Sequence, residues 1–157
     1  MAQIFLAIDY MYKNGYIYHD LKPENVLLDI KRYIKLPNFG LSKMVLNEDN
    51  INNSRNTIYG TLEYMAPEII KGIPYGQSDW FSFKVVLYEM FIGDFPFELK
   101  NRNIEDRNFY EKDIEYPTKT STEEKDLISK LLKIESYKRF GCNSSKEIKN
   151  SDLFKDN

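Results

Sequence analysis

The chain has 157 residues, the size of one domain, and 42% of them are hydrophobic, which is enough for a packed core and excludes wholesale disorder. Its 22 Lys and Arg residues nearly balance 24 Asp and Glu residues, and this net charge of −2 gives no reason to expect nucleic acid or an anionic membrane as a partner. The single cysteine, Cys142, cannot form an internal disulfide and fits a cytoplasmic, reducing compartment, and with one histidine it leaves too few ligands for a zinc site.

The first element is a predicted helix over residues 2–13, which ends at Asn14-Gly15. We expect it to be buried nearly all round, because apolar residues occupy one face and also widen beyond it: Ile4, Ala7, Ile8 and Met11, then Phe5, Leu6 and Tyr10. The stretch lacks the basic region of a signal peptide. No apolar run in the chain approaches the roughly 20 residues that a membrane span needs.

A polar loop follows, with the sequence Tyr18-His19-Asp20-Leu21-Lys22-Pro23-Glu24-Asn25. An acid, a cation and an amide lie within six positions, and Pro23 favours an irregular backbone. Polar side chains on a loop between two buried elements are typical of a catalytic loop. The alternative is a polar turn with a chance acid.

Residues 26–29 and 33–36 predict two short strands around a polar turn, and the run Pro37-Asn38-Phe39-Gly40 ends the second strand. Residues 47–56 are rich in Asn and predict an exposed loop.

The rest of the chain is predicted to be mainly helical. A short helix ends near Lys71-Gly72, and Ser78 or Asp79 caps the next helix. That helix, about 79–92, is apolar on every side and should be the central buried helix. Residues 101–112 indicate a short surface helix, Ser121 to Glu124 begin a further helix with Leu127 and Ile128 on its apolar face, and residues 146–154 form a last short one.

Four blocks in this order and spacing resemble the C-terminal lobe of a serine/threonine protein kinase. They are Tyr18-x-Asp20-x-Lys22-x-x-Asn25, Asn38-Phe39-Gly40, Gly60-Thr61 with Ala66-Pro67-Glu68, and Asp79-Trp80 with Ser82-Phe83, followed by Arg139 far downstream. Tyr18 and the stretches Asp79 to Phe83 and Arg139 to Gly141 resemble the AGC group, the basophilic kinases related to protein kinases A, B and C. The resemblance implies one partial kinase domain over 1–157, a mainly α-helical C-terminal lobe with small β-hairpins near the active-site cleft. Its catalytic loop would be 18–25 and its activation segment 38–68.

The same resemblance implies roles for residues in phosphoryl transfer from ATP, a reaction that depends on positioning and charge stabilisation. Asp20 would accept the proton of the substrate hydroxyl, and Lys22 would steady the transferring phosphoryl group. Thr61 would tie these two side chains together. Asn25 would hold Mg²⁺ through its amide oxygen, and Asn38 stands at the second metal position.

Three further residues are implied to be structural. Asp79 would brace the backbone of the catalytic loop from the central helix. Glu68 would pair with Arg139 across a long stretch of sequence. The alternative for that pair is two separate surface charges.

The substrate features implied by the resemblance are less specific. Ile58, Leu62 and Met65 match the pocket for the residue that follows the phosphoacceptor. Glu24 and Glu89 match acidic positions that read arginine in basophilic kinases, with ordinary solvated carboxylates as the alternative. Thr57 matches the phosphorylation site of the activation loop, with an ordinary loop threonine as the alternative.

The sequence departs from the family at several points. The resemblance begins inside the helix before the catalytic loop, so the Gly-rich loop and lysine of the small N-terminal lobe have no counterpart here. Asn38 replaces the metal-binding aspartate and His19 replaces the arginine that binds the activation-loop phosphate, while the central helix has Lys84 in place of a glycine.

Two functional hypotheses follow. One is a serine/threonine kinase that acts on protein substrates when a second polypeptide supplies the small lobe, and that is inactive as this isolated chain. The other is a pseudokinase-like or truncated lobe that binds protein partners without catalysis. In both cases we expect an exposed apolar surface where a small lobe would dock.

Overall fold

The computed structural model describes residues 1–44, 60–71, 78–97, 110, 114, 116–118, 120–133, 135–139 and 145–150. Its α-helices are α1 (Ala2–Lys13), α3 (Pro67–Ile70), α4 (Ser78–Ile92), α5 (Thr122–Leu131) and α6 (Ser145–Lys149). Short 3₁₀-helices are η1 (Pro23–Asn25), η2 (Phe39–Leu41), η3 (Leu62–Tyr64) and η5 (Ser136–Lys138). Helices with small pairs of strands therefore make up the described structure.

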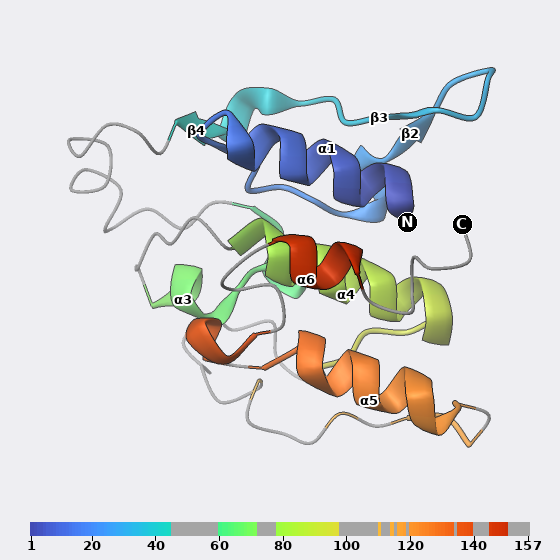
Figure 1. The fold of residues 1–157 in the computed structure, drawn as a ribbon. Coiled ribbons are helices and arrows are strands. Elements are labelled where there is room, and N and C mark those ends of the chain that lie inside the picture. The colour runs from blue at the N-terminus through green and yellow to red at the C-terminus, as the bar shows by residue number, and fades with distance from the viewer. Residues whose placement is uncertain are drawn as a thin grey trace.

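Two antiparallel strand pairs lie beside α1 on the side away from α4 (Figure 1). One is the predicted hairpin, in which β2 (Leu27–Leu28) pairs with β3 (Ile34–Lys35). The other joins β1 (Tyr16–Ile17) to β4 (Lys43–Met44), two segments far apart in sequence. The sequence did not predict this second pair, because a two-residue strand whose partner is distant carries no local periodicity. Together the pairs fix both ends of the 18–25 loop.

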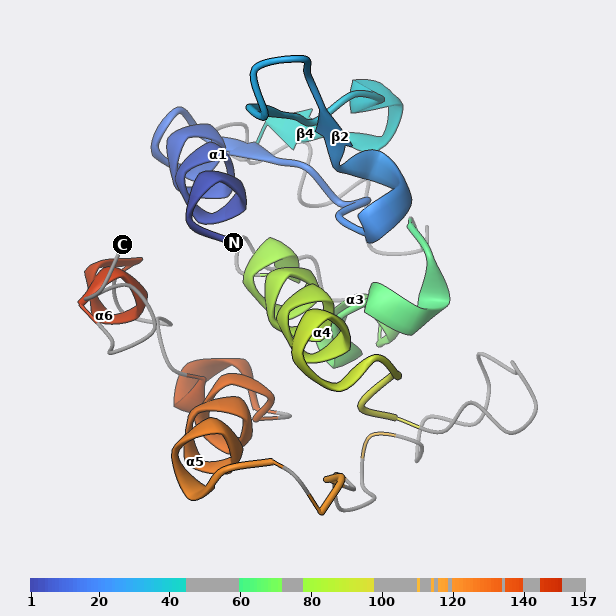
Figure 2. The same ribbon diagram turned by 90° about the vertical axis from the view of Figure 1, so that its right-hand side faces the viewer.

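The central helix α4 lies among the other helices, with α1 on one side and α5 on the opposite side (Figure 2). Every residue from Ser78 to Tyr88 is buried. Aromatic rings join it to its neighbours: Phe5 of α1 lies 5.4 Å from Trp80, and Phe81 stacks on Phe97 at 6.0 Å between ring centroids. A helix that is apolar on every side has to be enclosed in this way.

Two sequence expectations need correction. Helix α1 is not buried all round, since Leu6 is 55% and Tyr10 70% exposed and only one face packs on α4. Ser78 and Asp79 do not precede α4 as caps but form its first turn, because the Asp79 carboxylate is bound to the 18–25 loop instead. The surface helix expected at 101–112 lies outside the described residues except for Tyr110, which is buried.

Lys84 also lies in the core. It is 2% exposed, so its side chain does not extend to solvent, and it has an interaction partner, as a buried ammonium group requires. No described helix is long and apolar enough to cross a bilayer.

Candidate active site

The backbone of the 18–25 loop is held by α4. Both oxygens of the Asp79 carboxylate accept backbone hydrogen bonds, one from Tyr18 N–H at 2.6 Å and one from His19 N–H at 2.8 Å. Burial raises the pKa of Asp79 to about 6, while the two N–H donors act in the opposite direction by favouring the anion. A side chain 60 residues downstream thus fixes the loop immediately before Asp20, which is the bracing that the resemblance implies.

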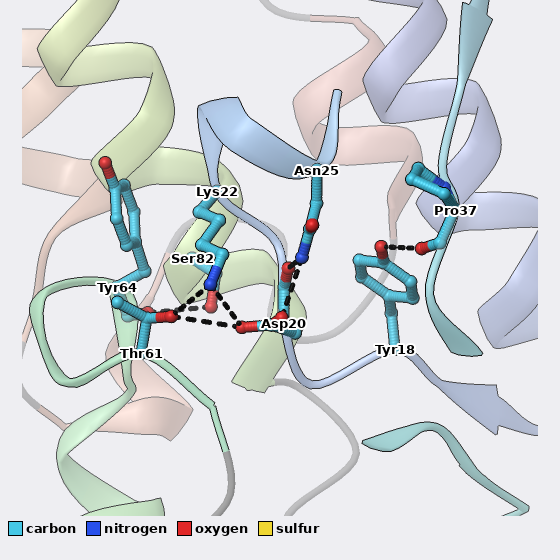
Figure 3. A network of polar contacts seen from close by, with 8 residues as sticks. All are labelled: Tyr18, Asp20, Lys22, Asn25, Pro37, Thr61, Tyr64 and Ser82. Atoms are coloured by element: carbon cyan, nitrogen blue, oxygen red, sulfur yellow. Dashed lines mark hydrogen bonds and ion pairs between the residues drawn. The ribbon is translucent and has the colours of Figure 1, made fainter. Parts of the chain in front are cut away.

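Asp20, Lys22 and Thr61 form one connected polar group (Figure 3). The Thr61 hydroxyl donates to Asp20 Oδ1 at 3.1 Å and accepts from Lys22 Nζ at 2.7 Å. Lys22 Nζ also lies 3.4 Å from Asp20 Oδ1, with the Lys22 side chain 22% exposed and that of Asp20 only 6%. A cation and an anion are therefore placed together at the edge of the core by a hydroxyl from a distant segment.

Asn25 has a defined amide orientation. Its Nδ2 donates to the Asp20 backbone oxygen at 2.8 Å and to Asp20 Oδ2 at 2.7 Å, and only an amide nitrogen can satisfy two oxygen acceptors. The Asn25 Oδ1 is the atom that this arrangement leaves for another ligand. It is a hard oxygen of the kind that Mg²⁺ prefers.

Asn38 lies nearby but in a different environment. It is exposed and adopts the left-handed conformation with φ 64°. The Tyr18 hydroxyl donates to the backbone oxygen of Pro37, and the Tyr18 ring meets Phe39 edge-on at 5.6 Å. The segment that carries Asn38 is therefore attached to the 18–25 loop on both sides of Asn38. Burial, aided by the charges of Asp20 and Asp79, raises the pKa of Tyr18 to about 12, so its hydroxyl stays protonated.

Asn25 and Asn38 fit a magnesium ion as oxygen donors but bring no formal charge to it. Within the described residues, no group of three or more His, Cys, Asp or Glu side chains could hold a metal ion. Magnesium bound here would rely on the phosphates of its nucleotide for negative charge.

His19 is half-buried and carries no charge at neutral pH. Burial and the nearby ammonium group of Lys43 lower its pKa to about 4. Its backbone is in the left-handed region with φ 69°, and its carbonyl oxygen lies only 2.5 Å from where a Cβ on Gly60 would be. Gly60 therefore permits the close approach of the 60–68 segment to the loop.

Acidic residues gather around Tyr64. Its hydroxyl donates to Glu89 at 2.8 Å, and burial, this bond and the charges of Glu89, Glu24 and Glu63 raise its pKa. Because both Glu24 and Glu89 act on the Tyr64 hydroxyl, the two implied substrate-reading carboxylates lie near the same ring. Glu24 is exposed and Glu89 is half-buried. The sequence analysis did not identify Tyr64, whose only signal was its place between Thr61 and Ala66.

Two side-chain hydrogen bonds also hold the backbone of the 61–66 segment. Ser82 of α4 donates to the Tyr64 backbone oxygen at 2.7 Å, and Tyr110 donates to that of Met65. Met65 is buried and Leu62 half-buried, so of these two implied pocket residues only Leu62 presents appreciable surface. Ile58 and Thr57 lie outside the described residues.

Glu68 and Arg139 form a buried ion pair, in which each of the two terminal guanidinium nitrogens donates to one carboxylate oxygen at 2.6 Å. The pair is almost fully enclosed, and Arg139 also donates to the Lys133 backbone oxygen and lies over the Phe81 ring. The separate-surface-charge alternative is thus excluded.

Comparisons with known proteins agree with this geometry. A model of the protein kinase domain matches residues 1–154. The cAMP-dependent protein kinase catalytic subunit 2 of Drosophila melanogaster is 36% identical over 98% of the chain and 43% of its own length. Ribosomal protein S6 kinase alpha-6 of Homo sapiens is 37% identical over 98% of the chain and 20% of its own length.

A third relative, the serine/threonine-protein kinase YPK2/YKR2 of Saccharomyces cerevisiae, is 36% identical over 99% of the chain and 23% of its own length. The chain spans less than half the length of each of these relatives. The family match covers almost the whole chain, and the three relatives are serine/threonine kinases of the AGC group. The chain therefore belongs to the protein kinase domain family, with AGC-type serine/threonine kinases as its homologues.

Proposed function

We propose that residues 1–157 form a kinase C-terminal lobe whose 18–25 loop transfers phosphate from ATP to a protein serine or threonine when it is combined with a small lobe. The activation segment would span residues 38–68. The observation that carries the proposal is the connected group of Asp20, Lys22 and Thr61, because a buried acid beside a partly exposed cation is what phosphoryl transfer to a hydroxyl needs.

Each member of the group has a distinct task. Asp20 accepts the hydrogen bond of the substrate hydroxyl, orients that oxygen toward the γ-phosphorus and receives its proton as the new P–O bond forms. Lys22 places its ammonium against the charge on the transferring phosphoryl group. Thr61 holds both side chains in register, and Asn25 restrains Asp20 from the other side.

Asn25 and Asn38 are the residues that would hold magnesium. The ion, when bound with ATP, neutralises phosphate charge. An amide at both positions weakens that binding, because neither contributes a negative charge.

An apolar surface over the strand pairs supports the need for a second lobe. On the β2–β3 hairpin Leu27 is 50%, Leu28 69%, Ile30 103% and Tyr33 59% exposed. Large exposed apolar side chains gathered on one hairpin are a feature of interaction surfaces. We assign the docking of a small lobe to this surface.

The second candidate is a protein-binding module without catalysis. Asn38 favours it, since an exposed amide replaces the carboxylate expected beside the metal. The two candidates differ in whether any phosphate transfer depends on Asp20.

A chimera tests the proposal. The small lobe of the Drosophila cAMP-dependent kinase catalytic subunit is fused before residue 1, and transfer of radiolabelled phosphate to a serine peptide with arginines before the serine is measured. We expect transfer that Asp20→Ala reduces at least about a hundredfold and that Asp126→Ala, which removes an exposed carboxylate of α5, leaves intact. A folded, ATP-binding chimera that transfers no phosphate even with Asn38→Asp would favour the binding module.

A further inference from the structure

An exposed aromatic ring lies beside the carboxylates that gather around Tyr64. The Phe95 ring meets the Tyr64 ring edge-on, with 5.4 Å between the ring centroids and 70° between the ring planes. Tyr64 is only 5% exposed, whereas Phe95 is 37% exposed. Apolar ring surface therefore continues outward from a buried residue of the 61–66 segment.

The turn after α4 fixes the position of Phe95. Gly93 ends the helix with a φ of +83°, and its N–H donates to the Glu89 backbone oxygen at 2.8 Å. The Asp94 carboxylate then accepts a hydrogen bond from Phe95 N–H at 2.8 Å. Phe95 is thus held both through its backbone and through its contact with Tyr64, although its ring is partly exposed. A ring fixed in this way loses little conformational entropy when a ligand binds to it.

The charges next to this ring are negative. Glu89 accepts the hydrogen bond of the Tyr64 hydroxyl, and the charges of Glu24 and Glu63 also act on Tyr64. No Lys or Arg among the described residues forms an ion pair with any of these three carboxylates. The surface that Phe95 shares with them therefore complements a ligand that combines a cation with an apolar group.

The spacing of these groups fits an extended peptide. Glu89 contacts the Tyr64 hydroxyl and Phe95 contacts the Tyr64 ring, so the two residues lie at opposite sides of a single side chain. In an extended peptide, side chains two residues apart point to the same side and are separated by about 6.6 Å. One such pair of side chains can reach both Glu89 and Phe95.

The direction of the peptide follows from the arrangement of the elements. The turn after α4 lies farther from the 18–25 loop than the segment with Tyr64 does (Figure 2). A peptide with its serine at Asp20 and a preceding arginine at Glu89 would therefore reach Phe95 with a residue that comes before the arginine.

We propose that Phe95 determines substrate specificity by binding an apolar side chain two positions before the arginine that Glu89 binds. This inference rests on the proposed function, because it assumes a protein substrate whose serine lies at Asp20. The resemblance implies only the arginine, and Phe95 adds the apolar residue. The substrate class is an extended peptide that is both basic and apolar.

Peptide binding to the 157-residue chain without ATP tests the proposal. Two fluorescent serine peptides, each with one arginine before the serine, differ only two positions before that arginine, where one has leucine and the other asparagine. By fluorescence anisotropy we expect the leucine peptide to bind about fivefold more tightly, as partial burial of one leucine side chain predicts. Phe95→Ser should abolish this ratio, while Phe95→Leu, which keeps an apolar side chain, should retain it.

Two further variants locate the effect. Phe91 is 46% exposed and lies two residues after Glu89 on α4, so it does not face Glu89, and Phe91→Ser should leave the ratio unchanged. Glu89→Gln should weaken both peptides equally and also leave the ratio unchanged. The melting temperature of each variant shows that it is folded.

The outcomes separate this inference from phosphoryl transfer. Equal affinity for the two peptides, no binding of either at millimolar concentration, or a ratio that survives Phe95→Ser would each overturn it. So would a dimer in sedimentation velocity that Phe95→Ser disperses, because a second copy would then cover the ring. A fivefold ratio that depends on Phe95 supports it even if the chimera transfers no phosphate, a result that would count against the proposed transfer alone.

Discussion

His19 holds a neutral imidazole where the resemblance places an arginine. The sign of its effect on stability follows from its pKa, which burial and the Lys43 ammonium lower to about 4 in the folded chain, against about 6.5 in the unfolded chain. The unfolded chain therefore binds more protons between these two values. The stabilising contribution is complete above pH 6.5 and is lost as pH falls through this interval toward 4.

His19→Asn measures this contribution. Asparagine tolerates the positive φ of this position and does not titrate. We expect the native chain to lose about 2 kcal/mol of unfolding free energy relative to the variant between pH 7.5 and pH 5. Urea unfolding at both pH values is the measurement, and Asp79, which titrates in the same range, contributes to both proteins. A constant difference between the two proteins would contradict the assigned pKa.

Gly60 is a second position at which the structure restricts the residue type. An added Cβ would lie 2.5 Å from the His19 carbonyl oxygen, and φ is +105°. Gly93 also has a positive φ, +83°, but no atom lies within 4 Å of its added Cβ. Comparing an alanine substitution at each position therefore separates the energetic cost of backbone strain from that of a steric clash.

We expect Gly60→Ala to destabilise the chain by more than Gly93→Ala, which should cost about 1 kcal/mol from φ strain alone. The additional cost at Gly60 comes from moving the 60–68 segment away from the loop. Equilibrium unfolding of the two variants gives the comparison. An equal loss in both would mean that the close approach to His19 is not needed.

At the scale of elements, long-range side-chain bonds hold the helices and loops in place. The Glu68–Arg139 pair joins α3 to the segment after η5, across 71 residues. Breaking one member of a buried pair leaves the other charge enclosed without a partner, which costs more than the pair itself contributes.

Glu68→Gln should therefore destabilise the chain by about 3–5 kcal/mol. The exposed pair of Glu135 and Lys138, 2.8 Å apart, is the matched control, and Glu135→Gln should change stability very little. Thermal unfolding followed by circular dichroism provides both values. Similar melting temperatures for the two variants would show that the buried pair is dispensable.

The sequence predicted the helices well where their apolar faces repeat locally. Residues 2–13 form α1 with the expected limits, and the helix after Ser121 is α5 (Thr122–Leu131). Strand β1 was missed because its partner β4 begins 26 residues after β1 ends. The start of α4 was misjudged because Asp79 binds a loop, and no local pattern reveals a distant acceptor role.

Some residues of the candidate site could likewise be predicted from the sequence, and others could not. The short spacing from Asp20 to Asn25 drew attention to the loop from residue types alone. The partners Thr61, Asp79 and the Glu68–Arg139 pair came from the family resemblance, because they are separated from each other by many residues. The contacts of Tyr64 with Glu89, and of Tyr110 with Met65, depend on tertiary packing, and neither residue type signals them.

At the scale of the whole molecule, the described elements form one packed body around α4, with the 18–25 loop and the strand pairs on one side (Figure 2). The proposed transfer group lies on that side, and the β2–β3 hairpin there carries exposed apolar side chains. The described structure therefore has a connected Asp20, Lys22 and Thr61 group, and an amide at position 38 where the resemblance places a carboxylate.

The most direct test compares phosphate transfer by the isolated chain and by the small-lobe chimera, each with Asn38 and with Asn38→Asp. We predict no transfer by the isolated chain with either residue, and at least a tenfold increase, as an order of magnitude, when Asn38→Asp restores a carboxylate in the chimera. Radiolabelled phosphate on a serine peptide is the readout. Transfer by the isolated chain that Asp20→Ala abolishes would contradict the account.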